Sequence, residues 1–100
     1  MARTRTELER ALAEDPFDGD ARREYARLLE EAGDLQGALR QWELVCRQRP
    51  ESAAGFLGAG RCHQALGASE RAATCVAEAR SKSDFAKTSP PDGQRPALQV

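Results

Sequence analysis

One histidine and three cysteines are the side chains best suited to nucleophilic or metal chemistry. His63 directly follows Cys62, and adjacent residues of a helix point about 100° apart, so the two cannot readily bind one metal ion. The spacings from Cys46 to Cys62 and from Cys62 to Cys75 contain no C-x-x-C motif. No base is placed beside a thiol. We therefore expect no catalytic residue, no metal and no cofactor, and an enzyme is the least favoured class.

Arginine offers a clearer binding chemistry. Arg23 and Arg27 are four residues apart, so on a helix they share one face. A guanidinium can bind a carboxylate through two parallel hydrogen bonds, which suits an acidic segment or a peptide C-terminus. The alternative is an ordinary solvated helix face, because Glu24, Glu30 and Glu31 are neighbours in the sequence.

Composition excludes several classes of partner. The chain of 100 residues has 15 basic and 16 acidic side chains and a formal charge of −1. Such a balance gives no general attraction to nucleic acid or to an anionic membrane. No apolar run is long enough to span a bilayer, and charged residues interrupt any secretory signal behind Arg3 and Arg5. An odd number of cysteines without an export signal predicts reduced thiols and a cytoplasmic location.

The segments that carry the arginines recur with a period of 34 residues. Pairs at this spacing are Pro16 and Pro50, Arg27 and Arg61, Gly33 and Gly67, and Ala38 and Ala72. Leu8, Trp42 and Val76 fall in the same register, and the apolar positions have the spacing of one helix face. A fixed period with a turn glycine and a helix-ending proline predicts a helix-turn-helix unit that is used more than once.

Five helices are expected within residues 4–84, separated by Pro16, Gly33, Pro50 and Gly67. Proline disfavours helix in the residue before it, and glycine readily adopts the left-handed conformation found at helix C-termini. The side chains expected to cap the helices are Asp18 or Asp20, Asp34, Ser52 and Ser69.

The repeated pattern resembles the tetratricopeptide repeat. The first full unit supplies Tyr25, Ala26, Leu29, Ala38, Trp42, Val45 and Pro50 at positions of the family pattern. The second supplies Phe56, Ala59, Gly60, His63, Ala72, Val76 and Ala79. Two positions depart from it, because Arg22 stands where the opening aromatic residue is expected and Asp84 replaces the closing proline.

The resemblance implies an all-α fold, a right-handed α-solenoid of about two and a half helix-turn-helix units. The repeat domain would cover residues 1–84, with a half repeat at 4–18 and full repeats at 19–52 and 53–84. Residues 85–100 are rich in proline and polar residues, so a flexible, disordered tail is expected there.

The resemblance also implies a binding surface. In the family, the first helix of each pair lines a concave groove that holds peptides. Arg27 and Arg61 occupy equivalent positions in successive repeats, so both should face this groove. The expected groove residues are Arg23, Arg27, Glu30, Leu57, Arg61 and Gln64. The chain has no asparagine, which argues against the lysine and asparagine clamp of the chaperone-binding members.

Two classes of function follow. The first is an adaptor or scaffold that binds an extended or helical segment, acidic in character, of another protein. The second is self-assembly into a homo-oligomer, because Ala73, Val76 and Ala77 lie on a surface of the last helix that a further helix would normally cover. No binding to nucleic acid is expected, since Tyr25 and Trp42 lie in core register without a basic stripe.

Overall fold

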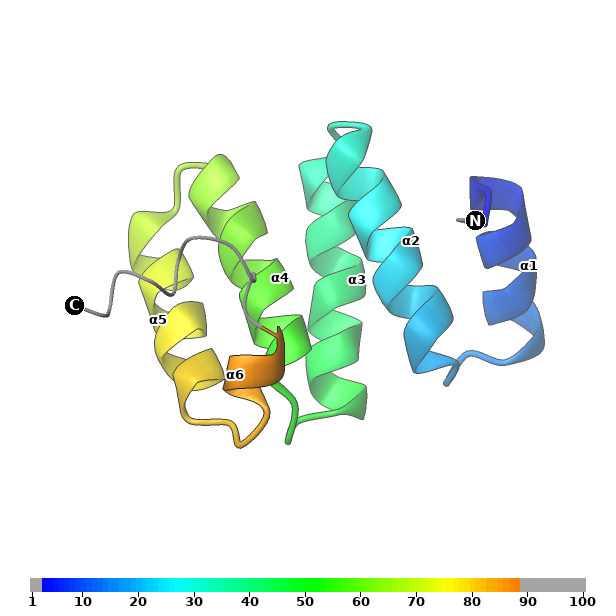
Figure 1. Cartoon of the computed structure of the whole chain (residues 1–100). Helices are drawn as coiled ribbons and strands as arrows, with labels where there is room; N and C mark the ends of the chain where they lie inside the picture. Colours follow the sequence, from blue (N-terminus) through cyan, green and yellow to red (C-terminus); the bar gives the residue numbers. More distant parts are fainter. Residues whose placement is uncertain (1–2, 89–100) are drawn as a thin grey trace.

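The computed structural model describes residues 3–88, and every regular element within that range is a helix. The helices are α1 (Arg5–Glu14), α2 (Gly19–Glu31), α3 (Leu35–Gln48), α4 (Ala53–Ala65), α5 (Ser69–Arg80) and α6 (Phe85–Thr88) (Figure 1). The first five are the helices that the sequence predicts. The short α6 was not predicted, and the expected flexible tail is wrong for residues 85–88. The rest of that tail, residues 89–100, lies outside the described residues.

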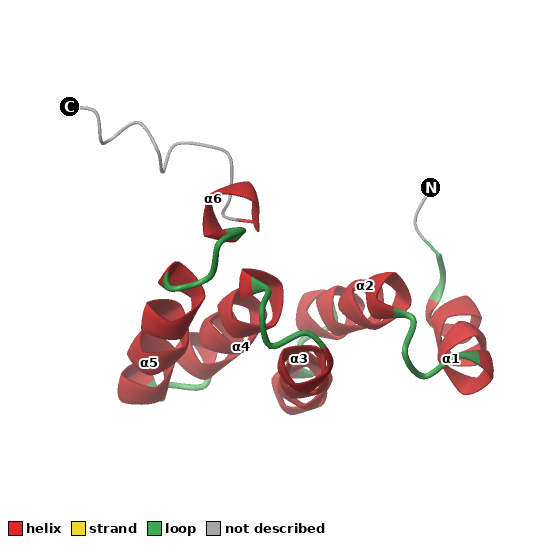
Figure 2. Ribbon diagram, turned by 90° about the horizontal axis from the view of Figure 1, so that it is seen from below, coloured by secondary structure: helices red, strands yellow, loops and turns green. Residues whose placement is uncertain are grey.

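The first five helices pack mainly against their neighbours in the chain. Seen end-on in Figure 2, α3 is set back behind α2 and α4, and α6 lies on the opposite side of α4 from α3. The molecule is elongated, with extents of 45 × 26 × 25 Å. Sequential helix packing therefore positions α2 and α4 on one side of the molecule.

Most of the predicted turns and caps are confirmed. Gly33 and Gly67 have φ angles of +86° and +85°, the left-handed conformation that ends α2 and α4 and that glycine adopts without a steric penalty. Three caps accept a backbone N–H near the start of their helix: Asp18 from Ala21, Asp34 from Gly37 and Ser52 from Ala54. These caps fix where α2, α3 and α4 begin.

The predicted cap at Ser69 is wrong. Ser69 is the first residue of α5, Ala68 is the N-cap, and no side chain caps the helix. Alanine has no oxygen that can accept a hydrogen bond from the first turn. The start of α5 is instead fixed by the preceding turn, in which the Ala68 N–H donates to the carbonyl of His63 at 2.8 Å.

Trp42 lies at the centre of the core, and only 1% of it is exposed. The cluster of buried residues around it joins α2, α3 and α4: Ala26, Leu29, Ala38, Val45, Ala59 and Cys62. Tyr25 packs against this cluster. A Cβ atom at Gly58 would overlap the Trp42 ring, so glycine at this position lets α4 approach the indole closely.

Asp84 joins the end of the fold back to α4. Its carboxylate accepts hydrogen bonds from the Ser52 hydroxyl and from the Ala53 N–H, both at 2.8 Å. The bond from the backbone of Ala53, followed by that from Ser52, lowers the pKa of Asp84. At the position where the family pattern has proline, this chain therefore has a second carboxylate-type cap for α4.

Arg22, which replaces the expected aromatic residue, is half-buried. One Nη donates to the Gln41 side chain at 2.7 Å, and the other donates to the carbonyl of Pro16 at 2.9 Å. Its buried Nε has no hydrogen-bond partner within residues 3–88. The guanidinium ties α2 to α3 and to the turn after α1, so polar contacts replace the packing that an aromatic ring would provide.

Candidate binding groove

A groove of about 550 Å³ runs along α2 and α4 and past the segment before α6. Four of the six predicted groove residues line it: Arg23, Arg27, Leu57 and Arg61. The lining also includes the cations Arg49 and Lys87 and the carboxylates of Glu51 and Asp84. Five cationic side chains thus face two carboxylates, and we call this surface the basic groove.

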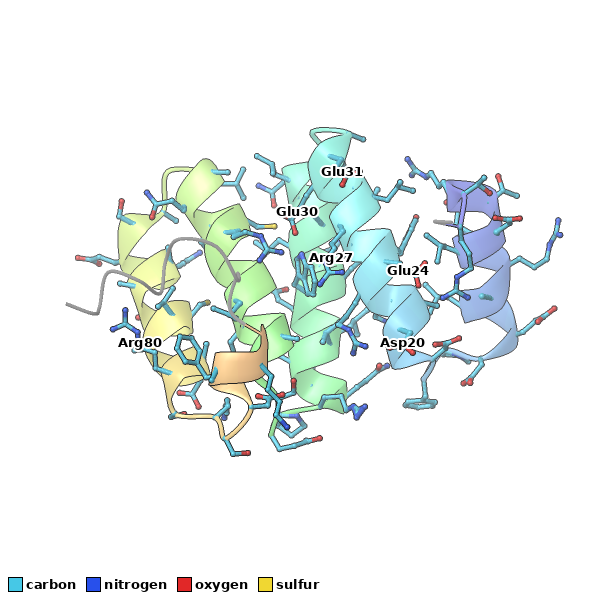
Figure 3. The ribbon with its side chains drawn as sticks, in the orientation of Figure 1. Asp20, Glu24, Arg27, Glu30, Glu31 and Arg80 are labelled. Carbon is cyan, nitrogen blue, oxygen red and sulfur yellow. The ribbon has the colours of Figure 1, made fainter. Side chains whose placement is uncertain are left out.

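Arg27 is the most available of the predicted cations. It is exposed on α2, and its side chain makes no hydrogen bond or ion pair with any other residue from 3 to 88. Figure 3 shows it on the side of α2 that faces the viewer, near Glu30. Its five N–H donors are therefore available to a ligand.

Arg61 is held in place by an internal ion pair. Its Nε and one Nη donate to the two carboxylate oxygens of Glu30, both at 3.1 Å. Glu30 also accepts from the Trp42 Nε1 at 2.6 Å, and the Arg61 guanidinium lies over the Trp42 ring, 5.5 Å from its centroid. Arg61 therefore covers the indole, and only its outer edge faces the groove.

Arg23 also has an internal partner, because it pairs with Asp20 on the same helix. The three predicted arginines line one groove, but they are not equivalent. A ladder of three freely available guanidiniums is not formed within the described structure, since Arg23 and Arg61 already contact carboxylates.

Arg49 was not identified from the sequence. It follows α3 as the C-cap residue, its side chain lines the basic groove, and it makes no side-chain hydrogen bond or ion pair with another described residue. Helical periodicity assigns faces only to residues inside a helix. Because Arg49 lies just before Pro50, in the connection to α4, the repeat pattern gave no signal for it.

Two predicted groove residues lie elsewhere. Glu30 does not line the basic groove, and its carboxylate is occupied by Arg61 and Trp42. Gln64 lines a second groove, of about 820 Å³, between α4 and α5. Leu57 and Arg61 line both grooves, so the two surfaces meet along α4.

The thiols lie in environments that favour the protonated form. Burial raises the pKa of Cys62 and of Cys46 to about 11, and it also raises the pKa of Cys75. Cys62 is fully buried, as predicted, whereas Cys46 and Cys75 are half-buried. Within residues 3–88, no group of three or more histidine, cysteine or acidic side chains is arranged to hold a metal ion.

No protein-family model, no curated protein and no solved structure matches the chain. None of the helices between residues 3 and 88 has both the length and the apolar character needed to cross a bilayer.

Proposed function

We propose that the protein is a non-enzymatic adaptor or scaffold that binds an acidic segment of another protein in the basic groove. The observation that carries this proposal is Arg27, an exposed guanidinium without an internal partner among residues 3–88, in a groove where cations outnumber carboxylates. Arg27 and Arg49 supply the charge for a carboxylate. Leu57 and Ala54 supply an apolar surface beside it.

The proposal includes a finer architecture, a right-handed solenoid of tetratricopeptide-like units. Three features support it: the period of 34 residues, the left-handed glycines at equivalent turns, and the packing of helices against their chain neighbours. In such an arrangement α2 and α4 are the first helices of successive pairs. The basic groove along these two helices is then the concave surface.

The raised thiol pKa values support a binding protein rather than an enzyme. At neutral pH a thiol with a pKa of about 11, as for Cys46 and Cys62, contains little of the thiolate that acts as a nucleophile. The three thiols are free, which fits a reducing compartment such as the cytoplasm. The proposed ligand is therefore a protein segment held without covalent chemistry.

Fluorescence polarisation with labelled peptides tests the proposal. The probe is a short peptide of Asp and Glu with one Leu, made with a free and with an amidated C-terminus, and its counterpart has Lys for every acid. Arg27→Glu should weaken the acidic probe by about fivefold or more, because a contact that stays wet is worth up to about 1 kcal/mol and charge reversal adds repulsion. Tighter binding of the free C-terminus would identify a terminal carboxylate as the ligand.

The matched control is Arg40→Glu, which makes the same change at an exposed position of α3 outside both grooves. It should leave the affinity of the acidic probe within about twofold of the wild type, since distant surface charges are largely screened at physiological salt. Equal losses in the two variants would show a non-specific charge effect. That result, or preference for the Lys peptide, would overturn the proposal.

A further inference from the structure

The second groove lies between α4 and α5, at the end of the row of helices opposite α1. Gly60, Ala72 and Val76 form much of its apolar surface, while Ala73 and Ala77 are exposed along α5. Arg80 also lines it, makes no hydrogen bond or ion pair with other residues from 3 to 88, and lies on the far edge of α5 in Figure 3. We call this surface the end groove.

The internal repeat relates the end groove to a surface that is already covered. Moving back by 34 residues converts its lining residues Gly60, Ala72 and Val76 into Ala26, Ala38 and Trp42. All three of these earlier residues are buried, and α4 packs over them in the core cluster. The chain thus shows what occupies such a groove when it is filled: a helix.

The contacts of α4 on that earlier surface are specific. A Cβ atom at Gly58 would overlap the Trp42 ring, and one at Gly55 would lie 2.8 Å from the backbone nitrogen of Cys46. The bulk of the indole and the close backbone approach therefore require small residues at these two positions, three residues apart on α4.

The end groove has different groups at the equivalent places. Val76 replaces Trp42, which leaves more room opposite the position of Gly58. Arg80 replaces Cys46 and brings a positive charge opposite the position of Gly55. A helix that fits the end groove should therefore carry a large aliphatic residue where α4 has Gly58, and a carboxylate where α4 has Gly55.

From this complementarity we infer that the end groove binds an amphipathic helix of a separate protein, with an acidic residue three positions before a large aliphatic one. The aliphatic side chain packs on Val76 and the alanines, and the carboxylate pairs with Arg80. Residues three apart lie on one face of a helix, so a single helix face makes both contacts. This surface is distinct from the basic groove and does not depend on the function proposed there.

A second copy of the chain does not offer such a helix within its described residues. The large hydrophobic side chains exposed between residues 3 and 88 are Phe17 and Leu66. Phe17 lies in the turn after α1 and Leu66 is the C-cap of α4, so neither forms part of an apolar stripe on a helix. The partner that supplies a large aliphatic residue from a helix face is therefore a different protein.

A peptide titration followed by NMR of the isotope-labelled protein tests the inference. The probe is an alanine- and glutamine-based peptide of about 20 residues, long enough to form a helix, with Glu three positions before Leu. Its counterpart carries Lys in place of Glu. The Glu probe should shift the amide signals of Ala73, Val76 and Ala77. Arg80→Glu should weaken the Glu probe by about two- to fivefold, the range of an exposed ion pair, and should make the Lys probe the better ligand.

The matched control is Arg71→Glu, at an exposed position of α5 outside the end groove. It should bind both probes as the wild type does, and circular dichroism should show equal helix content in all variants. Shifts confined to Arg27 and Arg49 would overturn the inference, as would equal affinity for the two probes or no shift at about 1 mM peptide, the limit of weak specific binding. A dimer that excludes the probe would also overturn it, in favour of a second copy as the occupant.

Discussion

The two ends of the row of helices are finished in different ways. At the α1 end, Leu8 is buried and polar side chains close the contact with α2: Arg3 pairs with Glu24, and the Tyr25 hydroxyl donates to Glu9 at 3.0 Å. At the α5 end, Ala73 and Ala77 are exposed and line an apolar groove. A half unit can thus end a stack if polar residues cover it, whereas an apolar outer face leaves a place for another helix.

The centre of the molecule sets the scale for both ends. Trp42→Ala removes the largest fully buried side chain and should lower the free energy of unfolding by about 3–5 kcal/mol. That loss is comparable with the total stability of a small domain. Thermal unfolding followed by circular dichroism measures it, and an unchanged melting temperature would contradict the central role of Trp42.

A pair of truncations compares the two ends directly. Leu8→Ala should cost about 2–5 kcal/mol, because it leaves a cavity under α1. Val76→Ala should cost less than about 1 kcal/mol, because Val76 is only half-buried and no helix covers it. Urea unfolding of the two variants provides the test. Equal losses would show that the α5 end is as well packed as the α1 end.

Asp84 offers a pH-dependent test of how the α5 end is anchored. Asp84→Asn should cost about 1 kcal/mol at neutral pH through loss of the charged cap of α4. The hydrogen bonds from Ala53 and Ser52 lower the folded-state pKa of Asp84, so its stabilisation is present above the unfolded pKa of about 3.9. That stabilisation is lost as the pH falls through the lower folded-state pKa. Unfolding curves from pH 7 downward should therefore converge for the two proteins, and a difference independent of pH would contradict the role of the charge.

The smallest effect is expected at the α1 end. Glu24→Gln removes the ion pair with Arg3, whose hydrogen bond lowers the pKa of Glu24. Both side chains are more than one third exposed, so solvent and salt screen the pair. The difference in melting temperature from the wild type should be small at low salt and should vanish near 1 M salt. A large loss that persists at high salt would mean that Glu24 contributes by packing.

Local signals explain how much of the fold could be predicted. Gly33, Gly67, Pro16 and Pro50 punctuate the sequence at the places where the helices end, because each acts through its own backbone. The cap at Ser69 failed, since a serine beside a helix start does not distinguish the cap from the first helical residue. The short α6 was missed because a segment of four residues has no periodicity to detect.

The site was predictable only in part. Arg23, Arg27 and Arg61 were found because they repeat on one helix face, and the structure brings them to one groove. Their partners were not predicted, since the pairing of Glu30 with Arg61 depends on the crossing of α2 and α4. Arg49 enters the groove from a connection, where sequence periodicity carries no information about direction.

The central claim is that the protein has two separate binding surfaces of different chemistry. One NMR sample titrated first with the acidic Leu-containing peptide and then with the helical Glu probe tests it directly. The account predicts two footprints: Arg27 and Arg49 shift with the first peptide, and Ala73 and Ala77 shift with the second. A single footprint shared by both peptides, or competition between them at every shifted signal, would contradict it.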